Sequence, residues 1–124
     1  MLRFHRQVFF DIKDIERLKV FTDELNSLNW SYTAHCLDNL KHRVIDIEGL
    51  LLFIKGLELT AESIFEFYAD ERSADIIKVC YRITWLKNMD IILVVNENKE
   101  IITIYMNSKE DNHITLRREL YING

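Results

Sequence analysis

The segment Ile76-Ile-Lys-Val-Cys-Tyr-Arg-Ile-Thr-Trp85 decides the fold class of this chain. Apolar and polar residues alternate along it, and β-branched and aromatic residues dominate, which is typical of a strand with two different faces. Similar segments follow at Ile91–Val95 and Ile101–Tyr105, joined by the polar loop Asn96–Glu100, and another precedes it at Ser63–Tyr68. Because short loops join strands that are neighbours in an antiparallel ladder, we expect a four-stranded antiparallel sheet.

The residues before this sheet have a helical period instead. Apolar residues recur at steps of three and four between Asp11 and Leu28, which predicts an amphipathic helix with Asp11 as its N-cap. Thr33 and Asp46 are expected to cap a second and a third helix, and the third runs to Gly56, a suitable C′ residue. The change from a helical to a two-residue period predicts an α+β fold, with N-terminal helices packed on the four-stranded sheet.

Length and composition fit one domain over residues 1–124. The chain is 48% hydrophobic with no proline and three glycines, which argues against a linker or a disordered tail. We expect residues 1–29 to form an N-terminal helical extension and residues 30–124 to form the core. No apolar run approaches the roughly 20 residues that cross a bilayer, and the first residues lack the features of a signal peptide. A soluble, cytoplasmic protein without a membrane partner is expected.

Metal and cofactor sites are not indicated. The four histidines include no His-x-x-x-His pair, the acidic clusters lack the spacing of a two-metal nuclease, and no glycine-rich phosphate loop is present. Cys36 and Cys80 have no metal-ligand spacing, and in a cytosolic protein we expect both thiols to be reduced and buried. We therefore expect no metal and no cofactor.

The net charge of −4 is unfavourable for binding nucleic acid, but the charges are unevenly distributed. Residues 57–75 carry six acids and one base. The chain from residue 78 onward holds seven bases: Lys78, Arg82, Lys87, Lys99, Lys109, Arg117 and Arg118. A basic face is one interpretation of this distribution, and an ordinary mixed surface is the other.

Cleavage of RNA without a metal ion needs three kinds of group. A base takes the proton of the 2′-hydroxyl, an acid protonates the leaving 5′-oxygen, and a cation stabilises the charged phosphorane. Histidine suits the proton transfers, and arginine and lysine suit the phosphate. The necessary residue types are supplied by His35, His113, Thr115, Tyr121, Arg43, Lys78, Arg82 and Arg117. Each also has a structural interpretation, such as a polar strand face for Lys78 and Arg82, or a helix C-terminus for Arg43.

A more specific signal lies in Thr33-Ala-His35-Cys-Leu-Asp-Asn-Leu40-Lys-His-Arg43-Val-Ile45-Asp46. This segment resembles the opening of a bacterial family of domains of unknown function, whose pattern is Ser/Thr-x-His-x-x-x-Arg-Met-x-x-Arg-x-Ile-Ser/Asp followed by a short helix and a β-meander. Asn39 stands where the family has its first arginine. The family is grouped with RelE/ParE-like toxins in the barnase–EndoU–colicin–RelE nuclease superfamily, and the resemblance covers Trp30–Tyr105, about 60% of the chain.

The resemblance implies a RelE/barnase-like fold and a metal-independent endoribonuclease toxin that cleaves RNA by acid–base attack of the 2′-hydroxyl. It implies that His35 transfers a proton and that Arg43 contacts phosphate. The segment Asp111–Leu116 also looks like the last part of such toxins, where a polar side chain on the last strand completes the site, which implies a role for His113 and Thr115. A protein antitoxin or immunity protein is the implied partner.

Two other functions remain open. The chain is either a non-catalytic, toxin-like binding module acting through a protein partner, or a toxin-like inhibitor that binds a host protein through its sheet. The acidic segment 57–75 and the asparagine at position 39 favour the binding module.

Overall fold

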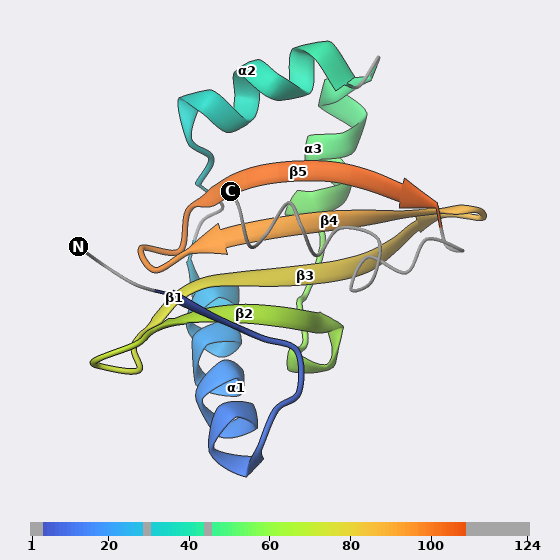
Figure 1. Cartoon of the computed structure of the whole chain (residues 1–124). Coiled ribbons are helices and arrows are strands. Elements are labelled where there is room, and N and C mark those ends of the chain that lie inside the picture. Colours follow the sequence, from blue (N-terminus) through green and yellow to red (C-terminus); the bar gives the residue numbers. More distant parts are fainter. Residues whose placement is uncertain (1–3, 29–30, 44–45, 109–124) are drawn as a thin grey trace.

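The computed structural model describes residues 4–28, 31–43 and 46–108. This part of the chain has an α+β fold with three α-helices and a five-stranded antiparallel sheet (Figure 1). The helices are α1 (Ile12–Ser27), α2 (Ala34–Arg43) and α3 (Ile47–Lys55), and a 3-10 turn covers Ala61–Ser63. The strands are β1 (Phe4–Gln7), β2 (Ile64–Asp70), β3 (Ile76–Leu86), β4 (Met89–Asn96) and β5 (Ile101–Ser108).

The starts of all three helices are confirmed, because each is set by a local hydrogen bond. The Asp11 carboxylate accepts a hydrogen bond from the backbone N–H of Asp14 at 2.8 Å, and the Asp14 side chain accepts one from the N–H of Asp11. The Thr33 hydroxyl and the Asp46 carboxylate accept hydrogen bonds from backbone N–H groups three residues later, at 3.2 and 2.9 Å. These side chains satisfy N–H groups that have no partner inside the helix.

The end of α3 differs in detail from the prediction. The helix stops at Lys55, and Gly56 follows with φ of −83°, in the right-handed region. Its N–H reaches the carbonyl of Leu52 at 3.2 Å. The helix therefore ends without the left-handed conformation for which a C′ glycine is usually needed.

The prediction of four strands is wrong, because β1 adds a fifth. The strands follow the order β1-β2-β3-β4-β5, and β1 pairs antiparallel with β2, with Arg6 opposite Tyr68. Phe4–Gln7 is short and has neither the alternation nor the apolar run of the other strands, so its strand conformation depends on the ladder that it forms with β2. The four predicted strands all form, joined as antiparallel neighbours.

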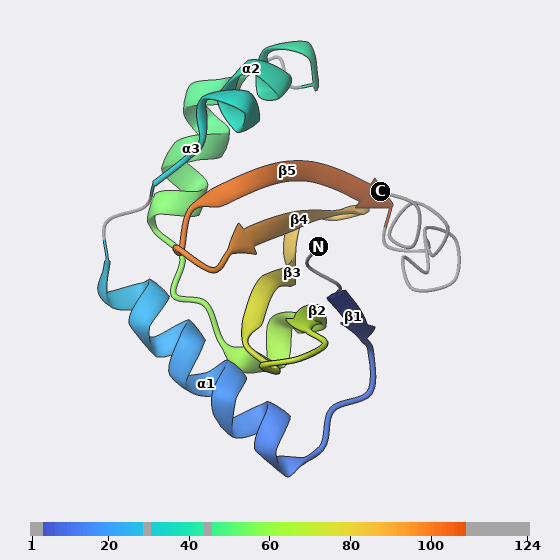
Figure 2. The same ribbon diagram turned by 60° about the vertical axis from the view of Figure 1, so that its left-hand side comes forward.

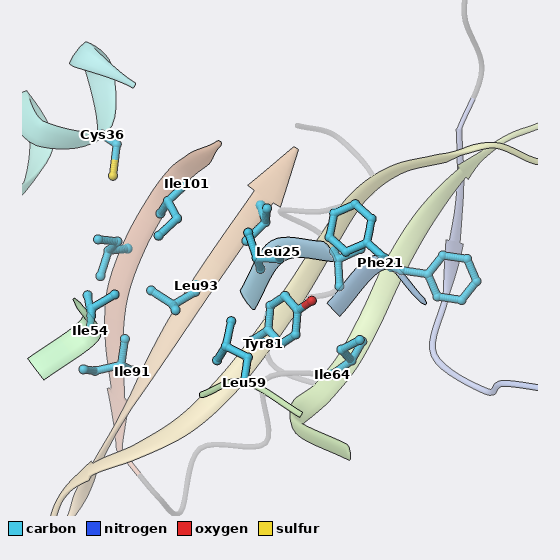
Figure 3. Close-up of a cluster of buried hydrophobic side chains, with 14 of the residues drawn as sticks. Phe21, Leu25, Cys36, Ile54, Leu59, Ile64, Tyr81, Ile91, Leu93 and Ile101 are labelled. Carbon is cyan, nitrogen blue, oxygen red and sulfur yellow. The ribbon is translucent and has the colours of Figure 1, made fainter. Parts of the chain in front are cut away.

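All three helices lie on one side of the curved sheet (Figure 2). Leu18, Phe21 and Leu25 of α1 share one hydrophobic cluster with residues of α2, α3 and strands β2 to β5 (Figure 3). Because α1 contributes to this core and β1 to this sheet, residues 4–28 pack as an integral part of the fold. Among the described residues, no helix is both long enough and apolar enough to cross a membrane.

Candidate functional site on the helix-free face of the sheet

The sheet has a second face, which no helix in the described part of the chain covers (Figure 2). Alternation along β3 places Val79 and Tyr81 in the core beneath the helices, so Lys78, Cys80 and Arg82 point to the other side. We call this side the helix-free face; it carries Arg6, Glu66, Tyr68, Lys78, Cys80, Arg82, Asp90, Ile92, Val94 and Tyr105. The two strand cations singled out from the sequence therefore share one face.

The register aligns a row of polar side chains across three strands. Arg6 of β1 lies opposite Tyr68 of β2, and Tyr68 lies opposite Lys78 of β3. The Lys78 ammonium is 4.4 Å from the centroid of the Tyr68 ring, within the range of a cation–π interaction. A cation thus lies on each side of the Tyr68 ring in the sheet.

Glu66 lies beside this row and forms an ion pair with Arg6. The Arg6 Nε–H donates to Glu66 Oε2, and the side chains of Arg6 and Glu66 are 12% and 0% exposed. Removing a carboxylate from water is costly unless a cation and hydrogen bonds stabilise it. Arg6 is therefore the partner that stabilises the buried Glu66 carboxylate in this otherwise apolar strand.

Arg82 lies further along β3 and donates hydrogen bonds to residues of two other strands. Its Nε–H donates to the carboxylate of Asp90 at 2.8 Å, and its terminal NH₂ group donates to the carbonyl oxygen of Ser108 at 2.9 Å. The guanidinium therefore joins β3 to β4 and to the end of β5. Asp90 balances its positive charge.

Burial keeps two of the weak acids on this face, Tyr68 and Cys80, protonated. It raises the pKa of the Tyr68 phenol, and the nearby Glu66 carboxylate raises it further. The pKa of the Cys80 thiol is raised by the same two causes, burial first. Tyr68 is therefore a hydrogen-bond donor at neutral pH, and Cys80 is a protonated thiol without the reactivity of a thiolate. Cys36 and Cys80 are both buried, as expected, and no disulfide joins them.

His35 lies elsewhere. It is an exposed residue in the first turn of α2, with its Nε2 atom 3.1 Å from the side-chain nitrogen of Asn39. The buried residues of this helix, Cys36 and Leu40, belong to the core beneath the helices. The structure therefore does not bring His35 together with Lys78 and Arg82. Asn39 is the residue that contacts the His35 ring.

The other candidates lie at or beyond the limits of the described chain. Arg43 is the last residue of α2, and its side chain is outside the described part. His113, Thr115, Arg117 and Tyr121 lie outside the described residues altogether.

Sequence reasoning missed Arg6 and Glu66. Arg6 lies in the strand that was not predicted, and Glu66 was counted only among the acids of segment 57–75. A usable signal was present, since Glu66 is the one charged residue within the apolar run Ile64–Ala69. Its partner is not predictable from spacing, because Arg6 is 60 residues away.

Another acid of segment 57–75 has a structural role. The Asp70 carboxylate accepts hydrogen bonds from the backbone N–H groups of Arg72 and Ser73 at 2.8 and 2.9 Å, and these bonds lower its pKa. Asp70 thus caps the turn between β2 and β3. Within the described ranges, no group of three or more His, Cys, Asp or Glu side chains is arranged to hold a metal ion.

Comparison of the chain with protein-family models, with curated proteins and with solved structures gave no match.

Proposed function

We propose that this protein is a metal-independent endoribonuclease of the toxin kind, with a RelE/barnase-like arrangement, and that RNA binds on the helix-free face. The observation that carries this proposal is the alternation of β3, which presents Lys78 and Arg82 on one face, beside the Arg6–Tyr68 row. Cations held on a rigid sheet suit a phosphodiester whose charge increases in the transition state.

The described residues differ in what they contribute to this chemistry. Lys78 forms no ion pair within the described residues, so its ammonium is the first candidate for contact with phosphate. Arg82 is paired with the Asp90 carboxylate, which neutralises part of its charge and fixes the orientation of its guanidinium. Glu66 holds the guanidinium of Arg6, and the protonated Tyr68 phenol is a donor between the two cations.

Proton transfer is assigned to the residues that the sequence indicated. His113, Thr115 and Tyr121 remain candidates for the acid and the base, with Arg117 as a further phosphate contact. His35 is the weaker candidate, because its helix packs beneath the opposite face of the sheet. No step of this proposal uses a metal ion or a cofactor.

A ribonuclease of this kind acts in the cytoplasm and must be silenced there. We expect a protein antitoxin or immunity protein to cover the helix-free face with carboxylates opposite Lys78 and Arg82.

One observation favours a second function, that of a non-catalytic binding module. Two of the cations on the helix-free face are already paired with carboxylates, Arg6 with Glu66 and Arg82 with Asp90. Ion pairs within the chain reduce the charge available to RNA, and they suit a protein partner that reads the face by shape and hydrogen bonds.

The test is incubation of the purified protein with total RNA in EDTA, followed by electrophoresis. The proposal expects cleavage that survives chelation, and a loss of about 10-fold or more in rate for Lys78→Ala, the usual scale for removing a charged contact. Lys87→Ala is the matched control, because Lys87 is an exposed lysine in the turn after β3. No cleavage by the wild type at high enzyme concentration, with intact folding, would favour the binding module. Equal rates for both variants would remove Lys78 from the site.

A further inference from the structure

A groove on the helical side of the molecule has no part in the proposed reaction. It has a volume of about 800 Å³ and lies between the end of α1, the segment at Tyr32, and the outer side of α3. The side chains that line it are Asn26, Leu28, Tyr32, Glu48, Leu51, Leu52, Lys55 and Leu57. Leu28 is 50% exposed and Leu52 is 69% exposed. Exposed leucines on both sides of one groove indicate a surface that a partner covers.

The polar groups inside the groove do not favour a charged small ligand. The Asn26 side chain is held by Leu59 on both sides, since its amide NH₂ donates to the carbonyl of Leu59 at 2.7 Å and its oxygen accepts from the Leu59 N–H at 3.0 Å. Burial raises the pKa of Tyr32 to about 12, so this phenol is neutral at physiological pH. Asn26 and Tyr32 therefore add no charge to the groove, and its leucines can contact a hydrophobic side chain.

The charges on its rim form a symmetric pattern. Glu48 and Lys55 lie seven residues apart on α3, which is two helical turns or about 10 Å along the same side. Leu51 and Leu52 are midway between them. Neither Glu48 nor Lys55 forms an ion pair within the described part of the chain.

From this pattern we infer that a second copy of the chain occupies the groove, with the two α3 helices antiparallel about a two-fold axis at Leu51 and Leu52. Antiparallel alignment about this centre places Glu48 level with the partner's Lys55, and Lys55 level with the partner's Glu48. The exposed Leu52 packs at this axis against the partner's Leu51 and Leu52. In an isologous interface the same surface of both copies must be self-complementary. This surface offers the exposed Leu52, the groove beside it, and the opposite charges of Glu48 and Lys55.

Sedimentation velocity as a function of protein concentration tests the inference, independently of any ribonuclease activity. We expect the mass to rise from 14.9 kDa toward twice that value. Leu52→Glu should weaken association by about 30-fold or more, the scale of losing a central anchor. Ile12→Glu is the matched control, because Ile12 is 75% exposed at the far end of α1 and should leave association unchanged.

Charge reversal makes the test specific for a second copy. Glu48→Lys and Lys55→Glu should each weaken self-association, because like charges then meet twice across the axis. Mixing these two variants should restore a heterodimer, since both contacts become attractive again. Circular dichroism checks that each variant is folded.

Two outcomes would overturn the inference. One is a wild-type chain that stays at the monomer mass up to about 1 mM, beyond the range of most specific association. The other is two charge variants that fail to combine although both are folded.

Discussion

The hydrogen bond between Thr22 of α1 and Tyr81 of β3 provides a quantitative test of how α1 belongs to the fold. The two oxygen atoms are 2.8 Å apart, and both side chains are buried. Tyr81→Phe keeps the ring and leaves the Thr22 hydroxyl in the core without this partner. Thr22→Val keeps the shape of the side chain and leaves the Tyr81 phenol in the core without this partner. Each single change should cost about 1–3 kcal/mol, the penalty for a buried polar group without a hydrogen bond.

The double variant Thr22→Val with Tyr81→Phe should be much less unstable than the sum of the two single variants. Both polar groups are then replaced by apolar groups of similar shape, which is nearly neutral. Because the two single costs sum to about 2–6 kcal/mol while the double variant costs little, the coupling energy should be about 2 kcal/mol or more. Urea unfolding followed by circular dichroism measures it, and each kcal/mol should move Tm by roughly 3–6 °C for a chain of this length. Strict additivity, within about 0.5 kcal/mol, would refute the reasoning and would mean that α1 is only loosely attached.

Three further predictions concern charge and ionisation. Arg6→Met should lower the unfolding free energy by about 3–5 kcal/mol, because it breaks a buried ion pair. Adding Glu66→Leu should recover most of this loss. A double variant that is as unstable as Arg6→Met would contradict the prediction. Because the folded state lowers the pKa of Asp70, its contribution is present above about pH 4 and is lost as the pH falls through the folded pKa. The stability difference between wild type and Asp70→Ala should therefore shrink in acid-unfolding curves. Burial raises the pKa of Tyr32 from 10.0 to about 12, because the folded state favours the neutral phenol. The contribution of this phenol to the unfolding free energy is therefore complete below pH 10 and is lost as the pH rises through 12. Ultraviolet titration of wild type against Tyr32→Phe measures that ionisation, and a midpoint near 10 would contradict the burial of this phenol.

The comparison between sequence and structure is clearest at the helix starts and in the meander. Asp11, Thr33 and Asp46 each bond a backbone N–H three residues away, so the information that starts a helix is contained in four consecutive residues. The strands β2 to β5 alternate or are strongly apolar, and the short loops between them favour antiparallel pairing of strands that are consecutive in the sequence. Local chemistry therefore determined the helices, the meander and the α+β class.

The candidate site depended on contacts that no local pattern contains. Arg6 and Glu66 are 60 residues apart, and they meet because β1 joins the edge of the sheet beside β2. The sequence indicated that Lys78 and Arg82 share a face, but it could not tell that α2 would carry His35 to the opposite side.

What the sequence determined by itself is thus the three helices, the four strands β2 to β5, and the alternation of faces along the strands, since these follow from backbone periods of 3.6 and 2 residues. Tertiary structure alone decided that Phe4–Gln7 is a strand, that Glu66 is a buried ion-pair partner, and that the helices leave one face of the sheet to Arg6, Lys78 and Arg82. The physical reason is that a short edge strand and a buried charge are stable only when distant residues supply hydrogen bonds and opposite charge, and those partners exist only in the folded chain.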